Sequence, residues 1–97
     1  MIIRLEKFGT TLISRPAGKE AFLVLEKTIK DLRANEIIEV DFEGVFTFSP
    51  GWGDEVLTPL LNEYGNRLIL KNTDNLSVGA TIRMLEEITG KTFHRAE

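Results

Sequence analysis

The spacing of hydrophobic residues predicts two short strands and a helix in the first third of the chain. Residues 2–7 and 10–14 are short and rich in β-branched residues, and Phe8-Gly9 between them is typical of a tight turn, so we expect an antiparallel hairpin. Proline cannot extend a strand ladder, so Arg15-Pro16 ends the second strand. Over residues 17–34 apolar residues recur every three or four positions, which predicts an amphipathic helix. Its expected core stripe is Ala21, Leu25, Ile29 and Leu32, with Phe22 beside it.

The rest of the chain shows a similar alternation of patterns. Residues 36–42 alternate apolar and acidic side chains, which predicts a strand with one buried face. Residues 43–53 contain three glycines and a proline and are expected to form a loop. A helix over 54–64 ending at Gly65, a strand over 66–71, a last helix from Leu76 to Gly90 and a polar tail over 91–97 follow. The expected buried stripe of the last helix is Val78, Ile82, Leu85 and Ile88.

The order β-β-α-β-α-β-α predicts an α/β fold with one domain over residues 1–97. We expect a four-stranded mixed sheet, because the opening hairpin is antiparallel and the helical crossovers join parallel strands. Right-handed crossovers place the helices mainly on one face of that sheet. The other face would then be exposed or covered by a partner.

Composition narrows the class of function. The 97 residues include 12 basic and 15 acidic residues and no cysteine, and no apolar run is long enough to span a bilayer. We therefore expect no nucleic acid and no membrane as partner, and a cytoplasmic location. His94 is the only histidine and lies in the polar tail, so a catalytic triad is excluded and we expect no enzyme and no cofactor.

The loop over 43–53 carries most of the functional interest. Serine before proline is held in an extended conformation, so Ser49 is well placed to cap the next helix with Pro50 in its first turn. Phe46 and Phe48 are expected to seal the edge of the core. Trp52 lies between two glycines that offer little local packing, which makes it the strongest candidate for contact with a partner.

Four carboxylates near this loop leave an alternative open. Asp41, Glu43, Asp54 and Glu55 could converge to hold magnesium or calcium through oxygen ligands. We favour a structural role for these carboxylates. Asp41 would accept hydrogen bonds from loop amides, and Asp54 and Glu55 in the first turn would interact favourably with the helix dipole. We therefore predict no metal site. Asp54 and Glu55 also disfavour a phosphate at this glycine-rich turn, because their negative charges would repel it.

Residues 40–45 (Val-Asp-Phe-Glu-Gly-Val) and 48–57 (Phe-Ser-Pro-Gly-Trp-Gly-Asp-Glu-Val-Leu) resemble the signature of a bacterial STAS-like domain family of unassigned function. Gly9, Leu12, Ser14 and Arg15 also resemble the opening of that family. The resemblance implies the fold of anti-sigma factor antagonists. It further implies that the loop after the third strand and the start of the next helix meet a histidine-kinase-like ATPase, without catalysis.

The sequence departs from the wider STAS group at one important position. The regulatory antagonists carry a phosphorylatable serine near the helix start, and in this register Gly51 occupies that position. Ser49 remains as a displaced candidate for phosphorylation, although a phosphate there would stand beside Asp54 and Glu55.

The sequence thus favours a non-catalytic regulatory module that binds a protein partner. The predicted contact residues are Ser49, Pro50, Gly51, Trp52, Asp54 and Glu55. A homodimer or other homo-oligomer is the main alternative, since an edge strand or an uncovered sheet face often pairs with its own copy. A small acidic metal-binding protein is the weaker alternative.

Overall fold

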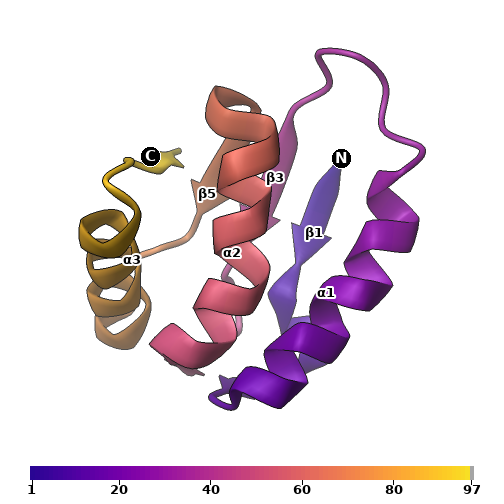
Figure 1. The fold of residues 1–97 in the computed structure, drawn as a ribbon. Helices are drawn as coiled ribbons and strands as arrows, with labels where there is room; N and C mark the ends of the chain where they lie inside the picture. The colour runs from indigo at the N-terminus through magenta and orange to yellow at the C-terminus, as the bar shows by residue number, and fades with distance from the viewer. Residues whose placement is uncertain (97) are drawn as a thin grey trace.

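The computed structural model describes residues 1–96 and contains an open, four-stranded sheet whose strands are all parallel (Figure 1). The strands lie in the order β1 (Ile2–Arg4), β3 (Ile38–Asp41), β5 (Leu68–Lys71) and β6 (His94–Arg95). Two further short strands, β2 (Thr11–Leu12) and β4 (Thr47–Phe48), form a separate parallel pair. The α/β class is as predicted, but the prediction of a mixed sheet is wrong.

The opening hairpin is the source of that error. Residues Leu5–Phe8 form a short 3-10 helix, η1, and Gly9 follows with a φ of 126°, a conformation that favours glycine. The chain therefore leaves β1 without folding back on it. Instead β1 pairs with β3, with Ile3 opposite Val40, and β2 pairs with β4, with Leu12 opposite Phe48.

Three helices follow strands in turn: α1 (Arg15–Ile29), α2 (Pro50–Tyr64) and α3 (Leu76–Thr89). A second 3-10 helix, η2 (Gly65–Arg67), leads from α2 into β5. The predicted α3 is confirmed, and Gly90 ends it in the left-handed conformation. By contrast, α1 stops at Ile29, short of the predicted Ala34, and α2 begins four residues before the predicted Asp54.

The three helices lie on one face of the sheet. Each crossover from β1 to β3, from β3 to β5 and from β5 to β6 moves one strand in the same direction, and right-handed crossovers then put every helix on the same side. Figure 1 shows α1 and α2 in front of the strands, with α3 beside α2. The opposite face carries Ile2, Arg4, Glu39, Ile69 and Lys71, which are exposed or half-buried.

The core lies between the sheet and the helices. Leu25, Val40, Leu57, Leu70 and Ile82 are fully buried in it. The α1–α2 contact depends on Gly18, because a Cβ there would lie only 2.8 Å from the carbonyl oxygen of Trp52.

Two predictions near the C-terminus are wrong. Ile88 does not continue the buried stripe of α3 but is 69% exposed. The segment expected to be a polar tail contains a buried residue, Phe93, followed by β6, in which His94 pairs with Ile69 of β5. Glu97 of the predicted tail lies outside the described residues.

Candidate partner-binding site

The start of α2 lies at the end of the molecule where all three helices begin. Parallel strands joined by helices run in one direction and the helices in the other, so the carboxyl ends of the strands and the amino ends of the helices share one edge. Backbone hydrogen bonds from Phe46 N to Thr10 O (2.7 Å) and from Ser49 N to Leu12 O (2.9 Å) hold the segments together there. In open α/β sheets this edge is the usual binding edge.

Ser49 is the N-cap of α2, as predicted. Its Oγ accepts a long hydrogen bond from Trp52 N (3.5 Å) and donates a short one to Ile13 O (2.7 Å). Pro50 occupies the first turn, where its missing amide hydrogen costs nothing. The hydroxyl of Ser49 thus joins the helix start to the segment after β2.

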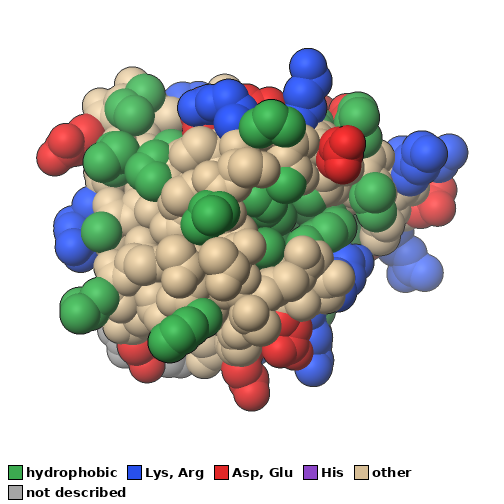
Figure 2. All heavy atoms as spheres, turned by 90° about the horizontal axis from the view of Figure 1, so that it is seen from below, with side chains coloured by type: hydrophobic (Ala, Val, Ile, Leu, Met, Phe, Trp, Pro, Cys, Tyr) green, Lys and Arg blue, Asp and Glu red, His purple; other side chains and the backbone are tan. Residues whose placement is uncertain are grey.

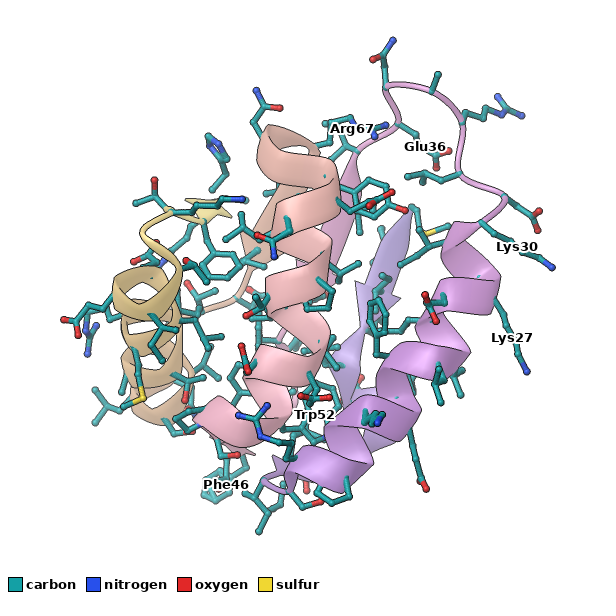
Figure 3. All side chains as sticks on the ribbon, viewed as in Figure 1. Lys27, Lys30, Glu36, Phe46, Trp52 and Arg67 are labelled. Atoms are coloured by element: carbon teal, nitrogen blue, oxygen red, sulfur yellow. The ribbon has the colours of Figure 1, made fainter. Side chains whose placement is uncertain are left out.

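Trp52 lies inside the molecule. Its side chain is 1% exposed, and its ring centroid is 5.8 Å from that of Phe48 and 6.1 Å from that of Phe8. Figure 3 shows it between α1 and α2. The prediction that this indole stands out as a contact for a partner is therefore wrong, because Phe8 of η1 and Phe48 of β4 pack against it.

Phe46 is the aromatic residue that faces outward. Phe48 seals the core as predicted, but Phe46 is 73% exposed and points away from the molecule at its lower end (Figure 3). Two more apolar side chains near it are exposed, Ile13 by 56% and Leu76 by 88%. Asn75 Nδ2 donates to Phe46 O (3.0 Å), which places the start of α3 beside Phe46.

We call this region the helix-start surface and define it by Ile13, Phe46, Ser49, Pro50, Gly51 and Leu76. Figure 2 looks onto this end of the molecule. Hydrophobic side chains and uncharged atoms occupy much of its centre, and charged side chains lie mainly around its edge. Apolar contact residues within a polar rim are typical of protein–protein interfaces.

Asp54 and Glu55 contact α1 rather than the amides of the first turn. Arg15 Nη1 donates to Asp54 Oδ2 (2.9 Å) and to Glu55 Oε2 (2.6 Å). Hydrogen bonds from Arg15 and from the Thr58 hydroxyl (2.8 Å) hold the pKa of Asp54 below its ordinary value, and the two carboxylates raise the pKa of Arg15. The ion pairs of Arg15 with Asp54 and Glu55 therefore join α1 to α2 at the edge of the helix-start surface.

Asp41 has the structural role that the sequence suggested. Its Oδ1 accepts from Asn72 Nδ2 (2.7 Å) and from Glu43 N (2.9 Å). These hydrogen bonds lower the pKa of the Asp41 carboxyl, against the opposing effect of its burial. The four carboxylates considered for a metal do not converge: within residues 1–96 no three acidic or histidine side chains are placed to hold an ion.

A separate hollow of about 410 Å³ lies between α1 and α2. Phe22, Ile29 and Tyr64 line it, with Glu26, Lys30 and Glu63. Figure 3 places Lys30 toward the end of the molecule opposite Phe46. None of the residues predicted to bind a partner lines this hollow.

Ile13, Phe46 and Leu76 are exposed at this end but are not among the residues predicted to contact a partner. A signal existed for Leu76, which stands two residues before Val78 and so on the other side of a helix from the core stripe. No comparable signal existed for Phe46. It lies two residues before Phe48, a spacing that places both side chains on the same face of a strand, and Phe48 is buried.

The fold and this edge define a class of protein: a two-layer α/β domain with an open parallel sheet and its helices on one side. The family model described as a STAS-like domain of unknown function (DUF4325) matches residues 20–77. The chain belongs to this family, as the sequence resemblance indicated. No curated protein and no solved structure matches the chain. In the described part of the chain, residues 1–96, the helices are too short or too polar to cross a bilayer.

Proposed function

We propose that the protein is a non-catalytic regulatory module that binds a protein partner through the helix-start surface. The observation that carries the proposal is the exposure of Phe46, 73% of whose side chain is accessible beside the Ser49 cap. A phenylalanine side chain exposed to water is unfavourable in free energy, and burying it in an interface would recover that free energy. Ile13 and Leu76 extend the same apolar region.

The kind of partner that we propose comes from the family resemblance. In anti-sigma factor antagonists the loop after the third strand and the following helix start meet a histidine-kinase-like ATPase, and the helix-start surface is the corresponding region here. The same proposal places the protein in the cytoplasm, which the lack of cysteines favours. Gly51 stands where the regulatory antagonists carry their phosphorylatable serine, so we propose constitutive binding without a phosphorylation switch at that position.

The proposal is tested by titrating the protein into purified histidine-kinase-like ATPases from the same organism, with calorimetry as the readout. Wild type should bind one of them, and Phe46→Ala should bind at least tenfold more weakly. This corresponds to a loss of about 1.4 kcal/mol of binding free energy, as expected when a central aromatic contact is removed. Leu23→Ala is the matched control, because Leu23 is also exposed but lies on α1.

Two results would contradict the proposal. One is the absence of binding to every ATPase of this type. The other is equal affinity of wild type and Phe46→Ala, which would move the contact away from the helix-start surface.

A further inference from the structure

Helix α3 exposes a row of apolar side chains on the flank of its core stripe. Val78, Ile82 and Leu85 are buried. Ala80, Met84 and Ile88 follow one another at a spacing of four residues and are exposed, Met84 by 46% and Ile88 by 69%. We call these three residues the α3 ridge. Exposed positions of a surface helix are normally polar, so the ridge is an uncovered packing surface.

The shape of the ridge suits contact with another helix. Rows of side chains four residues apart form the ridges used in the commonest class of helix–helix packing. Ala80 is small and Ile88 is large, and they lie on either side of Met84. In an antiparallel pair of two α3 helices with Met84 packed on Met84, Ala80 of each copy faces Ile88 of the other.

The charges beside the ridge are complementary to those of a second copy. Arg83 and Glu87 are exposed, and neither makes an ion pair within the part of the chain that the structure describes. In the antiparallel arrangement about Met84, Arg83 lies level with position 85 of the second copy along the helix axis, two residues and about 3 Å from Glu87. Two-fold symmetry repeats the contact, so each Arg83 lies near the other copy's Glu87.

We propose that two copies of the chain associate through antiparallel pairing of their α3 helices along the α3 ridge. The ridge contains none of the residues that define the helix-start surface. Leu76 of that surface lies four residues before Ala80, so the two regions are neighbours on α3. Dimerisation can be tested without any other protein.

Sedimentation equilibrium over micromolar to millimolar protein concentrations tests the pairing. Wild type should shift from monomer to dimer across this range, and Met84→Asp should remain monomeric, because it places a carboxylate at the centre of the contact. Leu23→Asp, a change at a similarly exposed position on α1, should dimerise like wild type. Thermal unfolding of both variants checks that each is folded. A wild type that stays monomeric at millimolar concentration, or a Met84→Asp variant that still dimerises, would overturn the proposal.

Charge reversal tests the register. Arg83→Glu and Glu87→Arg should each weaken self-association roughly tenfold at low salt, because each converts two attractive pairs into two repulsive ones. Mixing the two variants should restore association of wild-type strength, since every contact in the mixed dimer again joins opposite charges. A mixture that associates no better than either variant alone would contradict antiparallel pairing about Met84.

Discussion

At the scale of single residues, Trp52 is a structural residue. Its indole packs against Phe48 and Phe8, and the backbone of Trp52 contacts Gly18 of α1. The side chain therefore joins α2 to the β2–β4 pair and to η1. Its value to the protein is the burial of a large aromatic surface.

Replacing Trp52 should cost stability. Trp52→Ala should lower the free energy of unfolding by about 3–5 kcal/mol, because it leaves a large cavity in the core. Phe46→Ala, at an exposed position, should change it by less than about 0.5 kcal/mol. Urea unfolding followed by circular dichroism compares the two, and equal losses would contradict the burial described here.

Asp41 should make the protein sensitive to acid. Its pKa is lowered in the folded state by the hydrogen bonds from Asn72 and Glu43, so its contribution to stability is present above the unfolded pKa of about 3.9 and is lost as the pH falls through the folded value. Asp41→Asn should therefore be less stable than wild type at neutral pH, by about 1–2 kcal/mol. The difference should shrink below about pH 4, where wild type also loses the carboxylate.

Urea midpoints measured from neutral pH down to about pH 3 check this dependence. Asp74→Asn, an exposed change in the turn after β5, serves as the control. A difference between wild type and Asp41→Asn that stays constant throughout would show that the carboxylate charge contributes nothing.

Residue roles could be predicted from the sequence where neighbours in the chain decide them. Ser49 caps α2 because serine, proline and the following amides are adjacent in sequence. The exposure of Trp52 and Phe46 depends instead on which distant segment covers each of them. Phe8, forty-four residues before Trp52, packs against the indole, and Gly18 lets α1 approach the backbone of Trp52. The sequence around Trp52 carries no sign of these contacts.

At the scale of elements, two helices meet at a contact that glycine makes possible. A Cβ on Gly18 would lie 2.8 Å from the carbonyl oxygen and 2.9 Å from the Cα of Trp52, and backbone atoms cannot move aside cheaply. A Cβ on Gly51, near the same contact, would lie 3.6 Å from Arg15, which is an ordinary distance. The two glycines therefore have different reasons to be present.

Alanine should have opposite effects at these positions. Gly18→Ala should destabilise the protein by about 1–2 kcal/mol, because overpacking exceeds the gain in helix propensity. Gly51→Ala should be neutral or stabilising by up to about 1 kcal/mol. Thermal and urea unfolding of both variants test the contact, and a Gly18→Ala protein as stable as wild type would contradict it.

The helices could be predicted better than the strand pairing. Helical periodicity and caps are local, so α3 and most of α1 follow from the sequence. Pairing of β1 with β3 joins residues about thirty-seven apart, and two-residue strands such as β4 and β6 leave no pattern of alternation. The predicted hairpin is wrong because Phe8 ends a 3-10 helix and Gly9 does not turn the chain back onto β1.

At the scale of the whole molecule, the one-sided arrangement of the helices organises the surface. All three helices begin at one end, which brings Ile13, Phe46 and Leu76 together although they lie in different thirds of the chain. The α3 ridge continues from Leu76 along the same helix at a spacing of four residues, so the proposed dimer contact borders the helix-start surface.

Amide chemical-shift mapping tests the central claim most directly. The isotope-labelled protein is titrated with the histidine-kinase-like ATPase that it binds. The account predicts that the largest shifts cluster in residues 10–13, 46–51 and 75–77. Shifts confined to the bare face of the sheet or to the hollow between α1 and α2 would contradict it.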